Sequence, residues 1–103
     1  MKLQVKRLNS FPANKRTMPK ISFFYGIVIY MYFNDHYPAH FHAQYGEFTA
    51  KISIENFGLM DGYLPPKALS LVVEWTMLHQ KELMVNWDKM LKKEPFQAIA
   101  PLE

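Results

Sequence analysis

The chain has 103 residues, of which 50% are hydrophobic and 16% aromatic, the size and composition of one small domain with a well-filled core. It has no cysteine, which excludes disulfides and thiolate metal ligands, so any metal would need histidine and oxygen ligands. With a formal net charge of +3, no apolar run near the roughly 20 residues of a membrane span and no signal-peptide pattern at the N-terminus, we expect a cytoplasmic protein without membrane contact.

Positive charge is concentrated at the N-terminus. Residues 1–20 contain six lysines and arginines and no acid, whereas residues 21–103 contain six lysines and nine acids. The periodic apolar pattern begins near Met18, so we predict a flexible basic extension over residues 1–17 and a single domain over residues 18–103. Such an extension could bind nucleic acid through its phosphates, but the mildly acidic remainder lacks the basic face of a nucleic-acid-binding domain.

The first half of the domain has the pattern of β-strands. Its apolar runs are rich in β-branched and aromatic residues, and glycine, proline, asparagine and aspartate separate them. The run 48–54 alternates apolar and polar residues, which is typical of a strand with one buried face. Strands are predicted over residues 21–24, 27–33, 40–45 and 48–54, and a further short strand or loop over residues 59–64.

One long amphipathic helix is predicted over residues 66–93. Proline is tolerated in a first helical turn, so Pro65 and Pro66 can open the helix, and Pro95 would end it. Its apolar residues mostly recur at spacings of three and four, the stripe of a helix that covers a sheet. We expect residues 96–102 to return a short segment to the core. The predicted fold is therefore α+β, an antiparallel sheet of four or five short strands followed by one long C-terminal helix.

Three of the four histidines lie within seven residues, at His36, His40 and His42. On an extended strand His40 and His42 share a face, with Cα atoms about 6.6 Å apart. Their apolar neighbours Phe41 and Ala43 have the opposite parity, so we expect both histidines to point away from the core. Such a pair could share a metal, a phosphate or a proton-transfer task.

The fourth histidine, His79, lies at the edge of the helical stripe, four residues after Trp75. It is either a hydrogen-bonded histidine at the boundary of the core or a functional partner of the strand pair. With it, the residues predicted to form a binding surface are Asp35, His36, His40, His42, Tyr45 and His79.

Several motifs resemble a small bacterial family known as domain of unknown function 4160. They are Met18–Ile21, Phe24–Ile29, Asn34–His36, Pro38–Ala43 and Leu64–Leu69. The resemblance spans residues 18–103, with Ala39 where the family often has a second proline. It carries no established activity. Family genes often lie beside another small domain, as in toxin–antitoxin pairs, which implies a partner protein encoded nearby.

Three functions stay open at this point. The first is a binding or regulatory module that contacts a partner protein, with homo-oligomerisation as a further expectation. The second is a site for a divalent metal such as zinc, with His36, His40 and His42 as ligands and Asp35 or His79 as a further one. The third is a small metal-independent ribonuclease in which His40 and His42 are the catalytic acid and base, since the unperturbed pKa of histidine is near 6.5.

Overall fold

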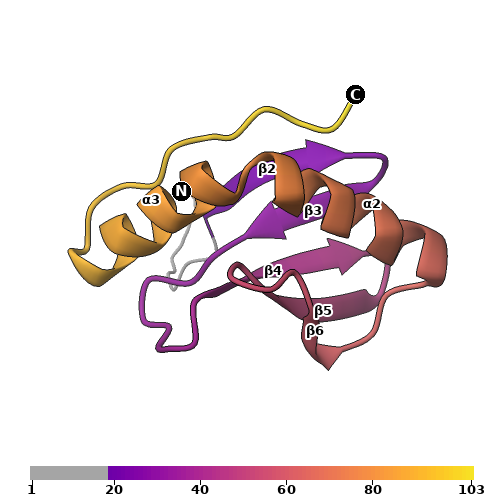
Figure 1. Cartoon of the computed structure of the whole chain (residues 1–103), viewed down its shortest axis with the longest axis horizontal. Coiled ribbons are helices and arrows are strands. Elements are labelled where there is room, and N and C mark those ends of the chain that lie inside the picture. Colours follow the sequence, from indigo (N-terminus) through magenta and orange to yellow (C-terminus); the bar gives the residue numbers. More distant parts are fainter. Residues whose placement is uncertain (1–18) are drawn as a thin grey trace, which may run out of the picture.

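The computed structural model describes residues 19–103, and the predicted basic extension over residues 1–17 lies outside this part of the chain. Within these described residues five strands are followed by two helices, so the α+β class is confirmed (Figure 1). The strands are β2 (Lys20–Phe24), β3 (Ile27–Tyr30), β4 (His40–Tyr45), β5 (Phe48–Ser53) and β6 (Leu59–Gly62). The helices are α2 (Pro66–Leu78) and α3 (Gln80–Leu91).

The five strands form one antiparallel sheet in which each strand pairs with the next along the chain, in the order β2-β3-β4-β5-β6. The short β2–β3 connection explains why these two strands, which are consecutive in the chain, pair with each other. Tyr25 and Gly26 have φ values of 51° and 80°, and they join the register partners Phe24 and Ile27. A two-residue loop with two positive φ angles matches the twist of antiparallel strands and closes a tight hairpin.

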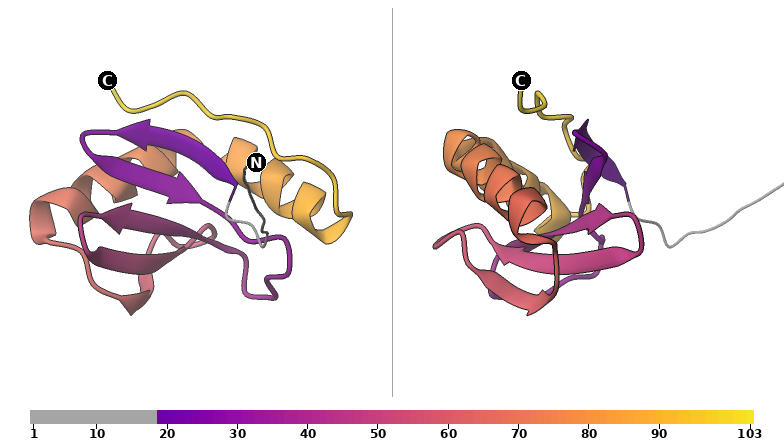
Figure 2. Two further views of the ribbon diagram at one scale, coloured as in Figure 1. Left: turned by 180° about the vertical axis from the view of Figure 1, so that it is seen from behind. Right: turned by 90° about the vertical axis from the view of Figure 1, so that its right-hand side faces the viewer.

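Both helices lie on one face of the sheet, and the hydrophobic core lies between the helices and the sheet (Figures 1 and 2). The inner-facing residues Ile29 and Ala43 are register partners and are fully buried. From the helices, Trp75 and Trp87 are also fully buried, and the ring of Trp75 contacts Phe41. Burial of such large apolar side chains is the main stabilising contribution to a domain of this size.

The prediction of one long helix is wrong, because the helical segment is interrupted at His79. His79 has φ −122° and ψ 23°, outside the helical region, and it ends α2 and begins α3. The side chain of Gln80 donates hydrogen bonds to the carbonyl oxygens of Ile54 (2.9 Å) and Glu55 (3.2 Å). This attachment to the two residues that follow β5 gives a physical reason for the break, since it fixes the start of α3 beside the sheet.

The predicted C-terminal segment does return to the core. Ile99 is buried, and its amide donates a hydrogen bond of 3.0 Å to Ile21 on the outer edge of β2. The buried Asn86 of α3 holds the segment through both the amide and the carbonyl oxygen of Gln97, each at 2.8 Å. This segment therefore covers one edge of the sheet, where Figure 2 shows it running along β2.

The connection between β3 and β4, residues 31–39, is the segment that builds the candidate site. The predicted strand 27–33 ends at Tyr30, and the chain then folds back before β4. The carbonyl oxygen of Ala39 accepts a hydrogen bond from the amide of Ile54, which fixes the end of the loop beside β5. No helix within residues 19–103 is both long and apolar enough to cross a membrane.

Candidate metal centre

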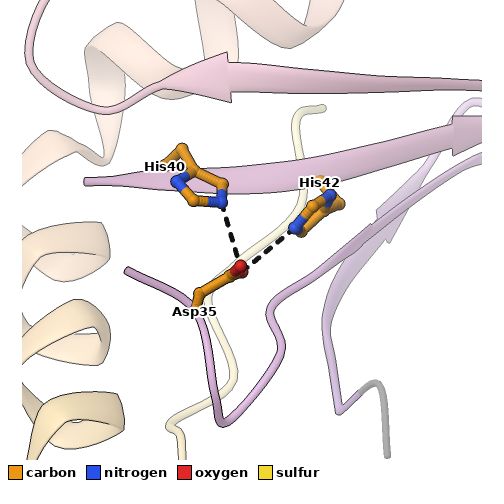
Figure 3. Close-up of side chains that lie close together, drawn as sticks. All are labelled: Asp35, His40 and His42. Atoms are coloured by element: carbon orange, nitrogen blue, oxygen red, sulfur yellow. Dashed lines mark hydrogen bonds and ion pairs between the residues drawn. The ribbon is translucent and has the colours of Figure 1, made fainter. Parts of the chain in front are cut away.

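Three side chains meet at the start of β4, namely Asp35 from the preceding loop and His40 and His42 from the strand (Figure 3). Asp35 Oδ2 lies 3.2 Å from His40 Nε2 and 3.1 Å from His42 Nε2. One ligand atom from each of the three residues lies within 4.8 Å of the other two. The loop and strand thus direct both imidazoles at the same carboxylate oxygen.

His40 is the deepest member of the cluster, with a side chain that is only 3% exposed. Its ring lies 5.3 Å from that of Trp87 on α3, measured between centroids, so His40 is buried rather than solvent-exposed although it shares a strand face with His42. His40 Nδ1 lies 2.6 Å from the carbonyl oxygen of Pro38. A carbonyl oxygen only accepts hydrogen bonds, so Nδ1 carries the proton and donates it.

This hydrogen bond determines what the other nitrogen of His40 can do. In a neutral ring protonated at Nδ1, Nε2 presents a lone pair. Nε2 lies 3.2 Å from Asp35 Oδ2, which is an ion-pair distance if the ring is protonated at both nitrogens, and it makes no hydrogen bond of good geometry to residues 19–103. Two other buried side-chain atoms in this part of the chain also lack a partner, Ser22 Oγ and Trp87 Nε1. Of these three, only His40 Nε2 belongs to the cluster.

His42 is less buried, at 15% exposure, and is held between two tyrosines. Its ring stacks on Tyr30 at a centroid distance of 5.3 Å and meets the ring of Tyr32 edge-on at 4.7 Å. Burial lowers the pKa of His42 below its usual value, and this effect outweighs the hydrogen bond with Asp35, which favours the charged form. Burial and the neighbouring Tyr32 raise the pKa of Tyr30 to about 12, so this phenol stays protonated at neutral pH.

The remaining predicted site residues lie elsewhere. His36 is exposed and is not among the three residues of the cluster. His79 pairs with Glu82 one turn along α3, where it has the geometry of a boundary histidine. Tyr45 lies at the far end of β4, opposite Phe48 on β5. Of the residues predicted for the site, the structure brings together Asp35, His40 and His42.

Sequence reasoning missed the surroundings of the cluster. Trp87 packs on His40, and Tyr30 and Tyr32 hold His42, but these contacts depend on pairing between segments distant in the chain. Lys51 on β5 is the register partner of His42 and was also missed. Parity along the strands was the only available signal, and it becomes informative only once the register is known.

A shallow cleft of about 230 Å³ lies beside His42 on the outer face of the sheet. It extends over β3, β4, β5 and β6, and its lining is mostly polar. The lining residues are Tyr30, Tyr32, His42, Thr49, Ala50, Lys51, Asp61 and Gly62.

A family model described as a domain of unknown function (DUF4160) matches residues 26–88. The chain belongs to the DUF4160 family. The matched region includes all three residues of the cluster and the strands that carry the cleft, so both lie within the part shared with DUF4160. No curated protein and no solved structure gives a significant match to the chain.

Proposed function

We propose that Asp35, His40 and His42 bind one divalent transition-metal ion, with zinc as the preferred ion. The observation that carries the proposal is the buried Nε2 atom of His40, which has no hydrogen-bond partner in residues 19–103 and faces a carboxylate oxygen. In a neutral His40 ring this nitrogen is a buried acceptor without a partner, which costs about 1–3 kcal/mol, and it faces a second acceptor. A cation between the two atoms removes this cost because both become its ligands.

The spacing of the ligand atoms supports a tetrahedral ion. With metal–ligand bonds of about 2.0–2.1 Å, the ligand atoms of a tetrahedral zinc site lie about 3.3 Å apart. The two distances from Asp35 Oδ2 to the imidazole nitrogens, 3.1 and 3.2 Å, are close to this value. All three ligand atoms lie within 4.8 Å of one another, so one ion can lie between the three groups.

The outer contacts of the cluster also suit a metal ligand. A ligating histidine typically donates its second ring N–H to a carbonyl or carboxylate oxygen, which fixes the ring orientation. The bond from His40 Nδ1 to the carbonyl of Pro38 has this form. Three protein ligands leave a fourth position for water or another small ligand, as in zinc sites that act chemically rather than structurally.

The other predicted functions fit this geometry less well. An acid–base ribonuclease needs two histidines that reach opposite sides of a scissile phosphate. Here both Nε2 atoms point at one carboxylate, and His40 is 3% exposed. Contact with a partner protein, a toxin–antitoxin role and binding of nucleic acid through residues 1–17 stay predictions.

The test is elemental analysis of untagged protein purified without chelators, followed by zinc titration of any metal-free fraction. We expect about one ion per chain in the wild type and loss of that ion in His42→Ala. His79→Ala is the matched control, because it removes another carboxylate-paired histidine outside the cluster and should leave the metal content unchanged. Circular dichroism shows whether each variant folds.

Two results would contradict the proposal. One is a folded wild-type protein that contains no metal and takes up none during titration. The other is equal metal content in the wild type and a folded His42→Ala variant. Copurification of iron instead of zinc would keep the three ligands and change the ion, since two histidines and one carboxylate also bind iron(II).

A further inference from the structure

A row of four polar side chains crosses the outer face of the sheet beside the proposed metal centre. Tyr30, His42, Lys51 and Asp61 are successive register partners on β3, β4, β5 and β6. Register partners in an antiparallel sheet point to the same face, with Cα atoms about 4.5–5.5 Å apart. All four residues line the cleft described above.

Lys51 is the residue of this row that indicates the charge of a ligand. Its side chain is half-buried between the neighbours His42 and Asp61, yet no ion pair joins its ammonium group to a carboxylate in residues 19–103. A cation inside a cleft and without a paired acid attracts an anionic ligand. Asp61 is the only acid among the described lining residues, and it lies on the side of Lys51 away from His42.

The balance of charge favours an anion. A divalent ion held by Asp35 keeps one net positive charge, Lys51 carries a second on the strand next to His42, and Asp61 offsets one of the two, which leaves a net charge of +1. A dianion could place one negative charge at the metal and the other at Lys51. A tetrahedral phosphoryl group has oxygens in several directions, so it can contact a metal and an ammonium group at once, whereas the two oxygens of a carboxylate lie closer together.

We propose that the metal-loaded protein binds a phosphate monoester in this cleft, with one phosphoryl oxygen in the open position of the metal and another at the ammonium group of Lys51. This inference rests on the proposed metal site and assigns its ligand class. The cleft volume of about 230 Å³ is sufficient for a phosphoryl group and part of the group that it esterifies. Tyr32, which is partly exposed, lines the cleft beside His42.

The test uses the full chain loaded with cobalt(II), whose visible absorption bands report on the ligands of the ion. Phenyl phosphate is titrated into the cobalt protein, and benzoate serves as the carboxylate probe with the same ring. We expect phenyl phosphate to shift the bands in a saturable way and to bind more tightly than benzoate. Lys51→Met should keep the cobalt bands and weaken phenyl phosphate binding by about tenfold or more.

Lys81→Met is the matched control, because Lys81 is an exposed lysine on α3, and it should bind phenyl phosphate as the wild type does. Normal cobalt bands that phenyl phosphate does not shift, or that it abolishes by extracting the metal, overturn the phosphate proposal alone. Equal affinity of Lys51→Met and wild type, or tighter binding of benzoate, also overturns it. A protein that never develops cobalt bands overturns the metal site and this inference with it.

Discussion

At the scale of single residues, His40 combines burial with an unsatisfied ligand atom. Its Nε2 atom makes no hydrogen bond within residues 19–103, while its ring packs on Trp87. A structural histidine would stabilise the metal-free protein, whereas a histidine retained for metal binding would cost stability until the ion arrives. The two roles therefore predict different effects of replacing His40 on the free energy of unfolding of the metal-free protein.

We expect His40→Phe to change the free energy of unfolding of the metal-free protein by less than about 1 kcal/mol and to abolish metal binding. Phenylalanine keeps a ring against Trp87 and removes the unsatisfied nitrogen, which offsets the lost hydrogen bond to Pro38. Urea denaturation in the presence of chelator measures the change. His40→Ala is the comparison, since it leaves a cavity and should cost about 2 kcal/mol. A loss of several kcal/mol in His40→Phe would identify a structural ion pair with Asp35.

A second prediction concerns Asn86, whose amide side chain is fully buried and makes two hydrogen bonds to the backbone of Gln97. Asn86→Leu should destabilise the protein by about 1–3 kcal/mol, because the two hydrogen bonds between the buried amide and the backbone of Gln97 are lost. Equilibrium denaturation provides the measurement. Gln44→Ala, which removes a single exposed hydrogen bond to Gly46, should stay within about 0.5 kcal/mol of the wild type. Equal effects of the two variants would refute this role of Asn86.

Part of the site was predictable at this scale. The spacing of His40 and His42 places them on one strand face, and turn residues before them predict the loop that carries Asp35. The choice of Asp35 over His36 as the third member depends on the path of the loop, which residue types alone do not determine. The burial of His40 depends on Trp87, which follows 47 residues later in the chain.

At the scale of secondary structure, the strands were predictable because alternation and turn residues are local properties. The predicted limits of β4 match the structure, and those of β5 differ by one residue at the C-terminal end. The helix break at His79 was not predictable, since no proline or glycine marks it. Its stabilising contacts join Gln80 to carbonyl groups 25 and 26 residues away.

These contacts give a prediction for the helix break. Gln80→Ala should lower the free energy of unfolding by about 1–2 kcal/mol, because two hydrogen bonds between α3 and the residues that follow β5 are lost. Thermal and urea denaturation measure the effect. The neighbouring Lys81→Ala removes an exposed side chain and should change stability by less than about 0.5 kcal/mol. If Gln80→Ala is equally neutral, another interaction must maintain the break.

At the scale of the whole molecule, metal binding should stabilise the folded protein. An ion that binds only the folded state adds about 2.7 kcal/mol when its free concentration is 100 times the Kd. For a domain of this size such a gain raises Tm by about 10–20 °C. Differential scanning calorimetry of the chelator-treated protein with and without added zinc measures the shift.

The same calorimetry on variants identifies where the ion binds. His42→Ala should lose the shift in Tm, and His79→Ala should keep it, because only His42 belongs to the cluster. A shift of equal size in all three proteins would place the stabilising ion elsewhere.

The way in which the C-terminal segment is attached affects the tendency of the protein to aggregate at high concentration. It attaches to the body through a few contacts, such as Trp75 Nε1 to the carbonyl of Ala100 at 2.8 Å and the amide of Ile99 to Ile21 at 3.0 Å. Breaking these contacts detaches the segment while the strands remain paired with one another, so it requires less free energy than global unfolding. The detached state bares the backbone of β2, which is a template for intermolecular β-pairing. Detachment therefore adds a second open sheet edge to that of the exposed β6, and a protein with a high melting temperature can still aggregate through β2 if the segment is weakly held.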